Sequence, residues 1–332
     1  MSERPLRFEE IVGQNQALRI FDEALQRGRL PQVYLFVGPE GVGKETTAKA
    51  LFFKLVCKEG LACGQCPGCR KFIRGVHPDV EYLEPQGKSL KIEQIRALEA
   101  KLRFVPLEAE RRLILIPQAE ALTREAANAL LKSLEEPPPY TLFVLLAVST
   151  DVLLPTIVSR SQVVRFRPLP AQLISQVLVE RFERSPEEAQ GLAILAEGSL
   201  GRALRLAERG FLEELSRLAT AIESKDPARL LSLAEVLAGL KDHLTFFLEL
   251  TLVWLRQSLR AGLGLEEYPR SFPPRVPKSV ALPAMALVEE TIRSLERNIN
   301  RELAMLALLI RLQELVRRAK DAEIATKGAS TA

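Results

Sequence analysis

Residues 37–46, VGPEGVGKET, constrain the fold of this chain more than any other stretch, because they form a nearly complete phosphate-binding loop. The apolar run that leads into them, residues 34–37, predicts a buried strand. The pattern that follows, residues 46–55, predicts a helix. A strand, a glycine-rich loop and a helix in this order are the context in which such a loop binds the phosphates of a nucleotide.

The chemistry of this loop is incomplete at one position. The backbone N–H groups can turn toward a polyphosphate because the loop contains three glycines: Gly38, Gly41 and Gly43. Lys44 supplies the cation that would meet the outer phosphates. The motif then requires a Ser or Thr hydroxyl that holds Mg²⁺, but this chain has Glu45, and the nearest hydroxyl belongs to Thr46. We therefore expect this loop to bind ATP or ADP weakly or not at all.

The size and charge of the chain exclude some classes of protein. Its 332 residues, of which 47% are hydrophobic, can form the cores of two or three domains. No apolar segment approaches the ~20 residues needed to span a bilayer, and residues 1–10 contain no apolar signal region, so we expect a cytoplasmic protein. The net charge is +4, and the basic residues are scattered rather than interleaved with aromatic ones, which disfavours a dedicated nucleic-acid binder.

All cysteines of the chain follow the predicted loop helix within one short segment: Cys57, Cys63, Cys66 and Cys69. The spacing C-x5-C-x2-C-x2-C lets four thiolates converge on one ion, and a shell of four sulfurs leaves no open position for water. Two disulfides are the alternative, but a cytosolic protein keeps its thiols reduced, and bridges this close together would be strained. The sequence therefore predicts a structural zinc site.

Further apolar runs extend the predicted sheet beyond the first strand, at residues 80–83, 112–116 and 141–148. Helical spacing of apolar residues separates them, at residues 91–102 and 126–134. Alternation of strands and helices predicts an α/β core with a mostly parallel sheet. His77, which stands before Pro78 and Asp79 at the start of the second run, is interpreted as part of a capped turn rather than as a catalytic group.

The end of the predicted strand 112–116 is the second position that decides the chemistry. In phosphate-loop ATPases an acidic residue at such a strand end holds the hydrated Mg²⁺, and a neighbouring group positions the attacking water. This chain has Pro117 and Gln118 there, and neither can bind a cation strongly or accept a proton at neutral pH. Glu120 is displaced along the chain, and a misplacement of about 1 Å can cost two orders of magnitude in rate. We interpret Glu120 as a solvated loop acid.

After residue 166 the pattern of apolar residues is only helical. It predicts helices at residues 171–182, 186–196, 201–209, 231–240 and 243–263, a Pro-rich loop at 269–283 and one long helix at 284–320. We divide the chain into an α/β core at residues 1–166 with a zinc module at 57–69, a helical lid at 167–209, an all-helical domain at 210–320 and a disordered tail at 321–332.

Several segments together resemble the AAA+ subunits of the bacterial DNA polymerase III clamp loader: FEEIVGQNQAL, RLPQVYLFVGPEGVGK, the four-cysteine insert, AANALLKSLEEPP and LLPTIVSRS. The resemblance covers roughly residues 7–205, and the remainder is similar more loosely. The resemblance implies that the last helical domain is a collar that holds a pentamer together. It implies as partners the ATP-hydrolysing gamma or tau subunits and a delta subunit. Through the complex it also implies the beta sliding clamp and primed DNA, with polymerase activity belonging to the holoenzyme.

The departures from that family are informative. Its hydrolysing subunits carry an acidic pair where this chain has Pro117 and Gln118, and a hydroxyl residue where it has Glu45. The resemblance therefore implies a subunit without ATPase activity of its own. The Ser-Arg-Cys motif of the family places its arginine in the ATP site of the adjacent subunit, and the matching residues here are Ser159, Arg160 and Ser161. It implies that Arg160 is an arginine finger that acts in trans.

Two other interpretations remain open. One is an active gamma-type clamp loader ATPase or another AAA+ ATPase, which the pair Pro117 and Gln118 disfavours. The other is a zinc-stapled DNA-binding module, which the scattered charge disfavours. The ATPases of the family also have a sensing arginine in their Gly-Ser motif. This chain has Gly201 at that place and Arg202 one residue later, so a sensing role for Arg202 is not predicted.

Overall fold

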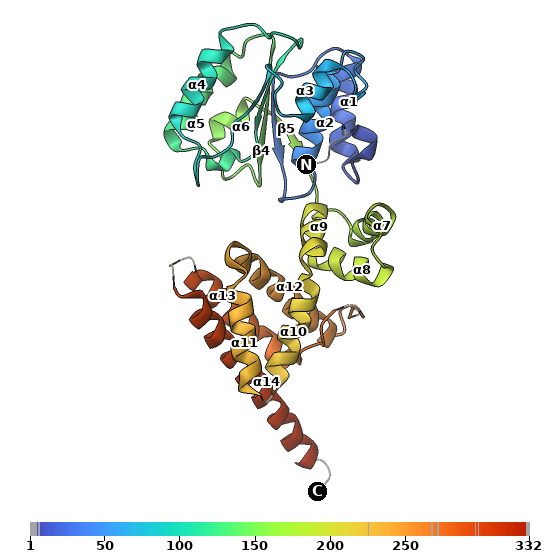
Figure 1. Cartoon of the computed structure of the whole chain (residues 1–332), viewed down its shortest axis with the longest axis vertical. Helices are drawn as coiled ribbons and strands as arrows, with labels where there is room; N and C mark the ends of the chain where they lie inside the picture. The colour runs from blue at the N-terminus through green and yellow to red at the C-terminus, as the bar shows by residue number, and fades with distance from the viewer. Residues whose placement is uncertain are drawn as a thin grey trace. The chain divides into compact units, whose positions relative to one another are not determined.

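The chain forms two compact units, defined by contacts between Cα atoms (Figure 1). Unit 1 comprises Met1–Pro170 with Gly198–Arg202, and unit 2 comprises Ala171–Glu197 with Ala203–Ala332. The computed structural model describes residues 5, 7–224, 226–266, 268–270, 272–295, 297 and 299–329, without the side chains of residues 242 and 323–329. The division of the helical half into a lid and a collar stays a prediction, because the helices of both fall largely in unit 2.

A five-stranded sheet forms the centre of unit 1, with the order β2-β3-β4-β1-β5 and parallel pairing throughout. Its strands are β1 (Val33–Val37), β2 (Val80–Tyr82), β3 (Arg112–Ile116), β4 (Thr141–Ala147) and β5 (Gln162–Arg165). Strand β1 lies between β4 and β5, and Val37 pairs with Ala147 on one side and with Arg165 on the other. The parallel α/β core predicted from the apolar runs is confirmed.

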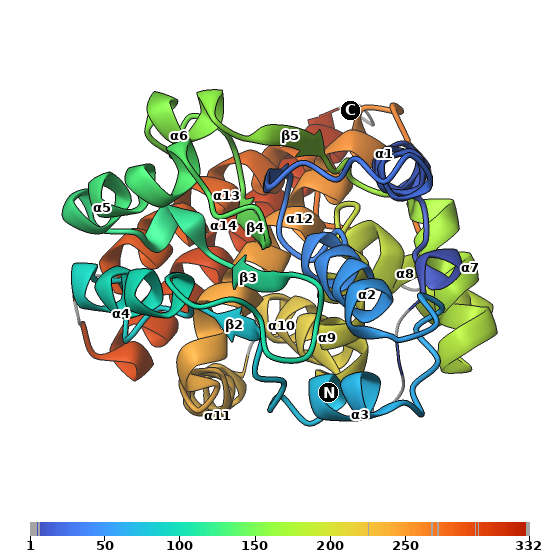
Figure 2. The same cartoon turned by 90° about the horizontal axis from the view of Figure 1, so that it is seen from above.

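Helices cover both faces of this sheet, as the view from above shows (Figure 2). One face carries α1 (Asn15–Gln26), α2 (Lys44–Val56) and α3 (Pro67–Ile73), and the other carries α4 (Ile92–Leu102), α5 (Arg124–Glu135) and α6 (Pro155–Ser159). Side chains alternate along a strand, so Tyr34 and Phe36 of β1 pack in the first layer and Leu35 packs in the second. Because helices cover both faces of the sheet, its buried strands appear in the sequence as continuous apolar runs.

Strand and helix ends in unit 1 differ from the predictions by a few residues. Strand β2 ends at Tyr82, and β4 ends at Ala147. Helix α6 begins at Pro155 because proline suits the first turn of a helix. Strand β5 had no predicted bounds. It lies at an edge of the sheet with only Val164 fully buried, and a strand this exposed carries little hydrophobic pattern.

Unit 2 contains helices joined by loops, with no strand among its described residues. Its helices are α7 (Ala171–Phe182), α8 (Pro186–Leu195), α10 (Phe211–Glu223), α11 (Pro227–Ala238), α12 (Leu244–Gly262), α13 (Lys278–Leu295) and α14 (Arg301–Ala329), with α9 (Leu200–Arg209) shared between the units. Short 3₁₀ turns lie at η1 (Phe8–Glu10), η2 (Ala119–Ala121) and η3 (Lys241–His243). None of the described helices is both long and apolar enough to cross a membrane.

The C-terminal prediction of one helix at residues 284–320 is wrong, because the segment forms two helices, α13 and α14. The side-chain oxygen of Asn300 accepts hydrogen bonds from the N–H groups of Glu302 (3.0 Å) and Leu303 (3.1 Å) and so starts a new helix. Helix α13 begins at Lys278 with Pro283 inside it, which shortens the predicted Pro-rich loop. Helix α14 continues to Ala329, which contradicts the predicted disorder of residues 321–329; residues 330–332 lie outside the described part of the chain.

Candidate functional site

The glycine-rich loop follows β1 and leads directly into α2, as the motif requires. Gly43 is the N-cap residue of α2 and has a φ of 103°, and Gly41 has a φ of 71°. Side chains with a Cβ atom rarely adopt such left-handed backbone conformations, so both positions favour glycine. The Thr47 hydroxyl donates to the carbonyl of Gly43 (2.8 Å) and fixes the first turn of the helix. The order of strand, loop and helix predicted from the sequence is therefore present, with glycine at left-handed backbone positions.

The cation of the loop is turned back onto the loop itself. Lys44 Nζ donates hydrogen bonds to the backbone carbonyls of Gly38 and Pro39, the latter at 2.7 Å. The side chain is buried, with 9% of the residue exposed. Burial lowers the pKa of Lys44, while the negative charges of Glu120 and Glu40 oppose this shift. A polyphosphate would have to displace two carbonyl partners from this ammonium group.

Two segments from elsewhere in unit 1 hold the loop in place. At the start of α9, the N–H of Gly201 donates to the carbonyl of Gly41 (3.0 Å), and a Cβ atom at Gly41 would lie 2.3 Å from Ser199 Oγ. On the other side, Gln14 Nε2 donates to the carbonyls of Val42 (3.1 Å) and Arg167 (2.8 Å). Sequence reasoning missed Gln14, although it lies in the FEEIVGQNQAL segment, because its partners are far away along the chain.

Replacing Gln14 with alanine is expected to lower the free energy of unfolding by roughly 1–3 kcal/mol, since buried polar partners would lose their hydrogen bonds. Gln14 is buried, with 4% of the residue exposed, and it also accepts a hydrogen bond from the N–H of Arg167 (3.3 Å). Urea denaturation of the purified chain measures the change. Gln16→Ala on the exposed side of α1 is the matched control, and a loss no larger than that of the control would contradict the clamping role.

The groups that would handle Mg²⁺ are arranged differently from those of an ATPase. Glu45 is exposed and forms an ion pair with Lys49 one turn later in α2 (2.5 Å). Beyond β3, Pro117 is half-buried and Gln118 is exposed. Glu120 is exposed in the 3₁₀ turn η2, and its negative charge acts to raise the pKa of Lys44. Its exposure is consistent with the interpretation of a solvated loop acid.

The cysteines converge as their spacing predicts. The Sγ atoms of Cys57, Cys63, Cys66 and Cys69 all lie within 4.8 Å of one another, and no disulfide joins them. Backbone N–H groups point at the sulfurs: that of Cys63 at Cys57 Sγ (3.4 Å), that of Cys66 at Cys63 Sγ (3.4 Å) and that of Cys69 at Cys66 Sγ (3.5 Å). Such hydrogen bonds stabilise thiolates, so the donor set can hold a metal ion.

The segment that carries the cysteines packs closely against α2. A Cβ atom at Gly68 would lie 2.3 Å from the carbonyl oxygen of Val56, so only glycine allows this approach. His77 lies nearby and is buried, and its Nδ1 accepts a hydrogen bond from the N–H of Asp79 (3.2 Å). The interpretation of His77 as part of a capped turn is confirmed.

Arg160 lies at the C-terminal end of α6, and its polar contacts go to α5 and α6. Its Nη2 forms an ion pair with Glu135 Oε1 at the end of α5 (2.6 Å). Its Nη1 donates to the carbonyl of Thr156 (3.1 Å) and to Ser159 Oγ (3.4 Å). The Ser161 hydroxyl donates to the carbonyl of Ile157 (2.8 Å), so serine at this place serves to close the helix. Arg160 is exposed, and its guanidinium is therefore accessible from outside the chain.

Arg160 and the glycine-rich loop lie at opposite edges of the sheet. Strands β1 and β5 are parallel, with Tyr34 opposite Gln162 and Val37 opposite Arg165. The loop begins after Val37 at the carboxyl edge, whereas Arg160 precedes Gln162 at the amino edge. Three residue steps of a strand separate the level of Gln162 from that of Val37, which corresponds to about 10 Å. The structure therefore does not bring Arg160 together with the loop of its own chain.

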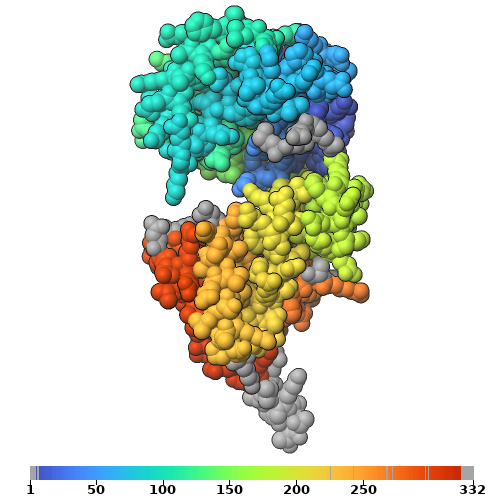
Figure 3. Space-filling view, in the orientation of Figure 1, coloured from blue at the N-terminus to red at the C-terminus, as the bar shows by residue number. Residues whose placement is uncertain are grey.

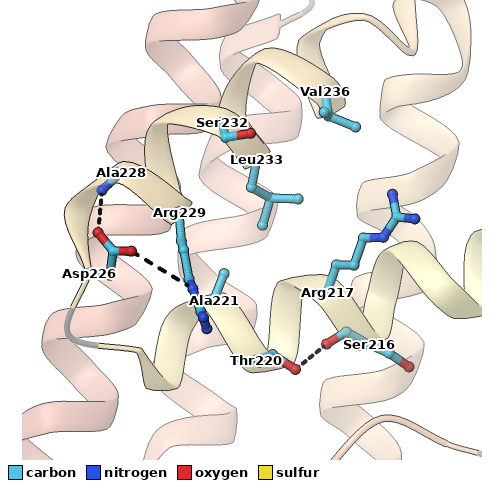
Figure 4. Close-up of a pocket in the computed structure, with 10 residues that line it drawn as sticks. All are labelled: Ser216, Arg217, Thr220, Ala221, Asp226, Ala228, Arg229, Ser232, Leu233 and Val236. Carbon is cyan, nitrogen blue, oxygen red and sulfur yellow. Dashed lines mark hydrogen bonds and ion pairs between the residues drawn. The ribbon is translucent and has the colours of Figure 1, made fainter.

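Unit 2 has a pocket of about 630 Å³ between α10 and α11 (Figure 4). The two helices lie side by side on the surface of that unit (Figure 3). The charged side chains of the pocket are already paired: Arg229 with Asp226 (3.8 Å), and Arg217 with Glu214 (2.9 Å). None of the residues predicted as functional from the sequence lines this pocket.

The fold and the loop define an α/β protein with a parallel sheet, whose first strand leads through a glycine-rich loop into a helix. A family model described as "DNA polymerase III, delta subunit" matches residues 13–170. Subunit delta' of Bacillus subtilis is 36% identical over 238 residues, which cover 71% of this chain and 68% of that protein. Subunit delta' of Pseudomonas aeruginosa is 32% identical over 311 residues, covering 87% and 94%.

Subunit tau of DNA polymerase III from Escherichia coli is also similar, with 32% identity over 247 residues. That match covers 70% of this chain but only 38% of the longer tau protein. The delta' relatives, in contrast, match over most of their own length. The chain belongs to the family of DNA polymerase III delta' subunits.

Proposed function

We propose that this chain is a non-hydrolysing AAA+ subunit of the bacterial DNA polymerase III clamp loader. It assembles with gamma or tau and delta subunits in the cytoplasm, acts as a stator, and helps to load the beta sliding clamp onto primed DNA. Its own contribution to ATP hydrolysis is Arg160, which reaches the nucleotide of a neighbouring subunit. One observation supports this proposal most strongly: Arg160 is exposed at the sheet edge opposite the loop of its own chain, so only another subunit can present a nucleotide to it.

The incomplete loop supports the absence of hydrolysis by the chain itself. The hydroxyl that would hold Mg²⁺ is replaced by Glu45, whose carboxylate is paired with Lys49, and the strand end at Pro117 and Gln118 has no carboxylate. The Lys44 ammonium is bound to two carbonyls of its own loop, which disfavours a bound polyphosphate. The alternative function, a gamma- or tau-type ATPase, is favoured by the glycines, by Lys44 and by the similarity to subunit tau.

We expect the purified chain to release no phosphate from ATP above background, because neither the Mg²⁺ ligand nor the group that positions water is present. Steady-state phosphate release measures this, with the Lys44→Ala variant as the control for contaminating ATPases. Turnover that disappears in Lys44→Ala would contradict the proposal and support a gamma-type ATPase. Co-purification with gamma, delta and the beta clamp tests the assembly independently of hydrolysis.

We also propose that the cysteine cluster binds one structural zinc ion. Zinc prefers four thiolate ligands in a tetrahedral shell, with sulfur at about 2.3 Å from the metal. Four Sγ atoms within 4.8 Å of one another, three of which accept hydrogen bonds from backbone N–H groups, fit such a shell. The ion would cross-link the segment between α2 and α3, and the closed shell leaves it no catalytic position.

A further inference from the structure

The ion pair between Arg160 and Glu135 joins the ends of two helices in unit 1. Glu135 is the last residue of α5, and Arg160 is the C-cap residue of α6. The atoms Nη2 and Oε1 are 2.6 Å apart, and the side chains of Arg160 and Glu135 are 34% and 47% exposed. The pair is thus accessible to a partner, yet ordered by two helix ends that pack against each other.

The position of Glu135 is unfavourable for an acid unless a cation is near. The C-terminus of a helix carries a partial negative charge, and a carboxylate there is destabilised. Helix α5 nevertheless ends with two consecutive acids, Glu135 and Glu136, before Pro137. The guanidinium of Arg160 offsets the charge of the first of these. Glu135 is therefore better explained by its pairing with Arg160 than by the stability of its own helix.

Both terminal nitrogens of Arg160 already have partners. Nη1 donates to the Thr156 carbonyl and to Ser159 Oγ, and Nη2 is bound to Glu135. An arginine that meets two phosphate oxygens uses a fork of neighbouring N–H groups, so at least part of this arrangement must open. The partners on α6 are neutral, whereas the carboxylate of Glu135 also repels an incoming phosphate. Glu135 is the partner that competes with the nucleotide.

We propose that Glu135 is a positioning residue for Arg160, which holds the guanidinium in the free subunit and releases it when a neighbour presents a nucleotide phosphate. This inference rests on the proposed finger role of Arg160. The carboxylate and the phosphate compete for the same cation, so Glu135 weakens the binding of ATP at the neighbouring site. A nucleotide without a γ-phosphate does not displace Glu135, and the finger then returns to its pair.

The test uses the assembled complex with gamma subunits whose own Ser-Arg-Cys arginine is replaced by alanine, so that only the site served by this chain keeps a finger. Glu135→Gln is expected to lower KM for ATP by about 1.4- to 5-fold, the effect of losing an exposed ion pair, at unchanged kcat. The carboxylate opposes phosphate binding equally before and during the reaction, which is why kcat does not change. Glu136→Gln, one residue later, is the matched control and leaves both constants unchanged.

The outcomes separate this inference from the proposed function. If Arg160→Ala leaves the turnover of this complex unchanged, the finger role is wrong, and the inference about Glu135 is lost with it. If Arg160→Ala abolishes turnover while Glu135→Gln leaves KM unchanged or lowers kcat, only the inference about Glu135 is overturned. Binding of a non-hydrolysable ATP analogue to the same complex tests the variants that have no turnover. Tighter binding in Glu135→Gln that vanishes when Glu135→Gln is combined with Arg160→Ala supports the inference, because a merely structural role of Glu135 would not depend on Arg160.

Discussion

Replacing Arg160 with alanine is expected to abolish ATP hydrolysis at the one site that this chain serves. Arginine fingers generally contribute about 10³- to 10⁵-fold to the rate, because a planar guanidinium stabilises the charge that develops on the transferred phosphate. Arg160 is exposed at the amino edge of the sheet, opposite the edge that carries its own loop, so under the proposed function its loss acts on a neighbour. Phosphate release by the assembled complex measures the effect.

The size of the observed change depends on the other ATPase sites of the complex. Gamma subunits whose own Ser-Arg-Cys arginine is replaced by alanine leave one intact finger, and turnover of that complex should fall to background with Arg160→Ala. Arg160→Lys should restore little, because lysine keeps the charge but lacks the two-pronged fork. Arg165→Ala, an exposed arginine at the other end of β5, is the control. Full turnover of the Arg160→Ala complex with normal assembly would contradict the finger role.

Removal of the proposed zinc ion from the cysteine cluster is expected to cause a large loss of stability in unit 1. Structural zinc contributes about 10–16 kcal/mol to the folding of isolated zinc fingers. If only a fifth of this applies to a segment anchored in a larger domain, the loss of about 2–3 kcal/mol lowers Tm by roughly 5–10 °C. Cys69→Ser should have a similar effect, since Cys69 is fully buried and cannot be replaced by water as a ligand.

The measurement combines the metal content of the purified chain with its thermal unfolding. We expect one zinc ion per chain, a fall in Tm on chelation, and recovery when Zn²⁺ is added back. Chelation should not lower the Tm of Cys69→Ser further. Amide hydrogen exchange should increase mainly in α3 and at the N–H groups of Cys63, Cys66 and Cys69, which point at sulfur atoms. If the purified chain contains no metal and its Tm does not change on chelation, the four thiols pack together without an ion.

Local signals predicted the α/β core well because they depend on neighbours along the chain. The buried strands β1, β3 and β4 have burial on both faces, which gives uninterrupted apolar runs. The edge strand β5 is mostly exposed and was given no bounds. The apolar pattern of residues 284–320 predicts one helix because its helical spacing continues across the break. The Asn300 cap that separates α13 from α14 is a single residue in that pattern.

The residues of the candidate site also fall into two groups: those that short spacing in the sequence predicts, and those that only packing between distant segments brings together. The sequence predicted the cysteine cluster and the conformation of the glycine-rich loop, since both follow from residue types at short spacing. It could not predict that Gln14 holds the loop through the carbonyl of Arg167, 153 residues away. It named Arg160 only through the resemblance to a family, and it gave no role to Glu135. Contacts between distant segments depend on packing, which a linear pattern does not encode.

By itself, the sequence determined that a strand, a glycine-rich loop and a helix begin the core, that four thiols meet, and that Mg²⁺ lacks its usual ligands at Glu45 and Gln118. Only the tertiary structure decided at which edge of the sheet the glycine-rich loop and Arg160 lie. The parallel register of β1 and β5 separates Arg160 from the loop of its own chain. The contact between the ends of α5 and α6 allows Arg160 to pair with Glu135. The physical reason is that a motif is fixed by covalent neighbours, whereas the direction in which a side chain can reach a partner is fixed by how the strands and helices pack.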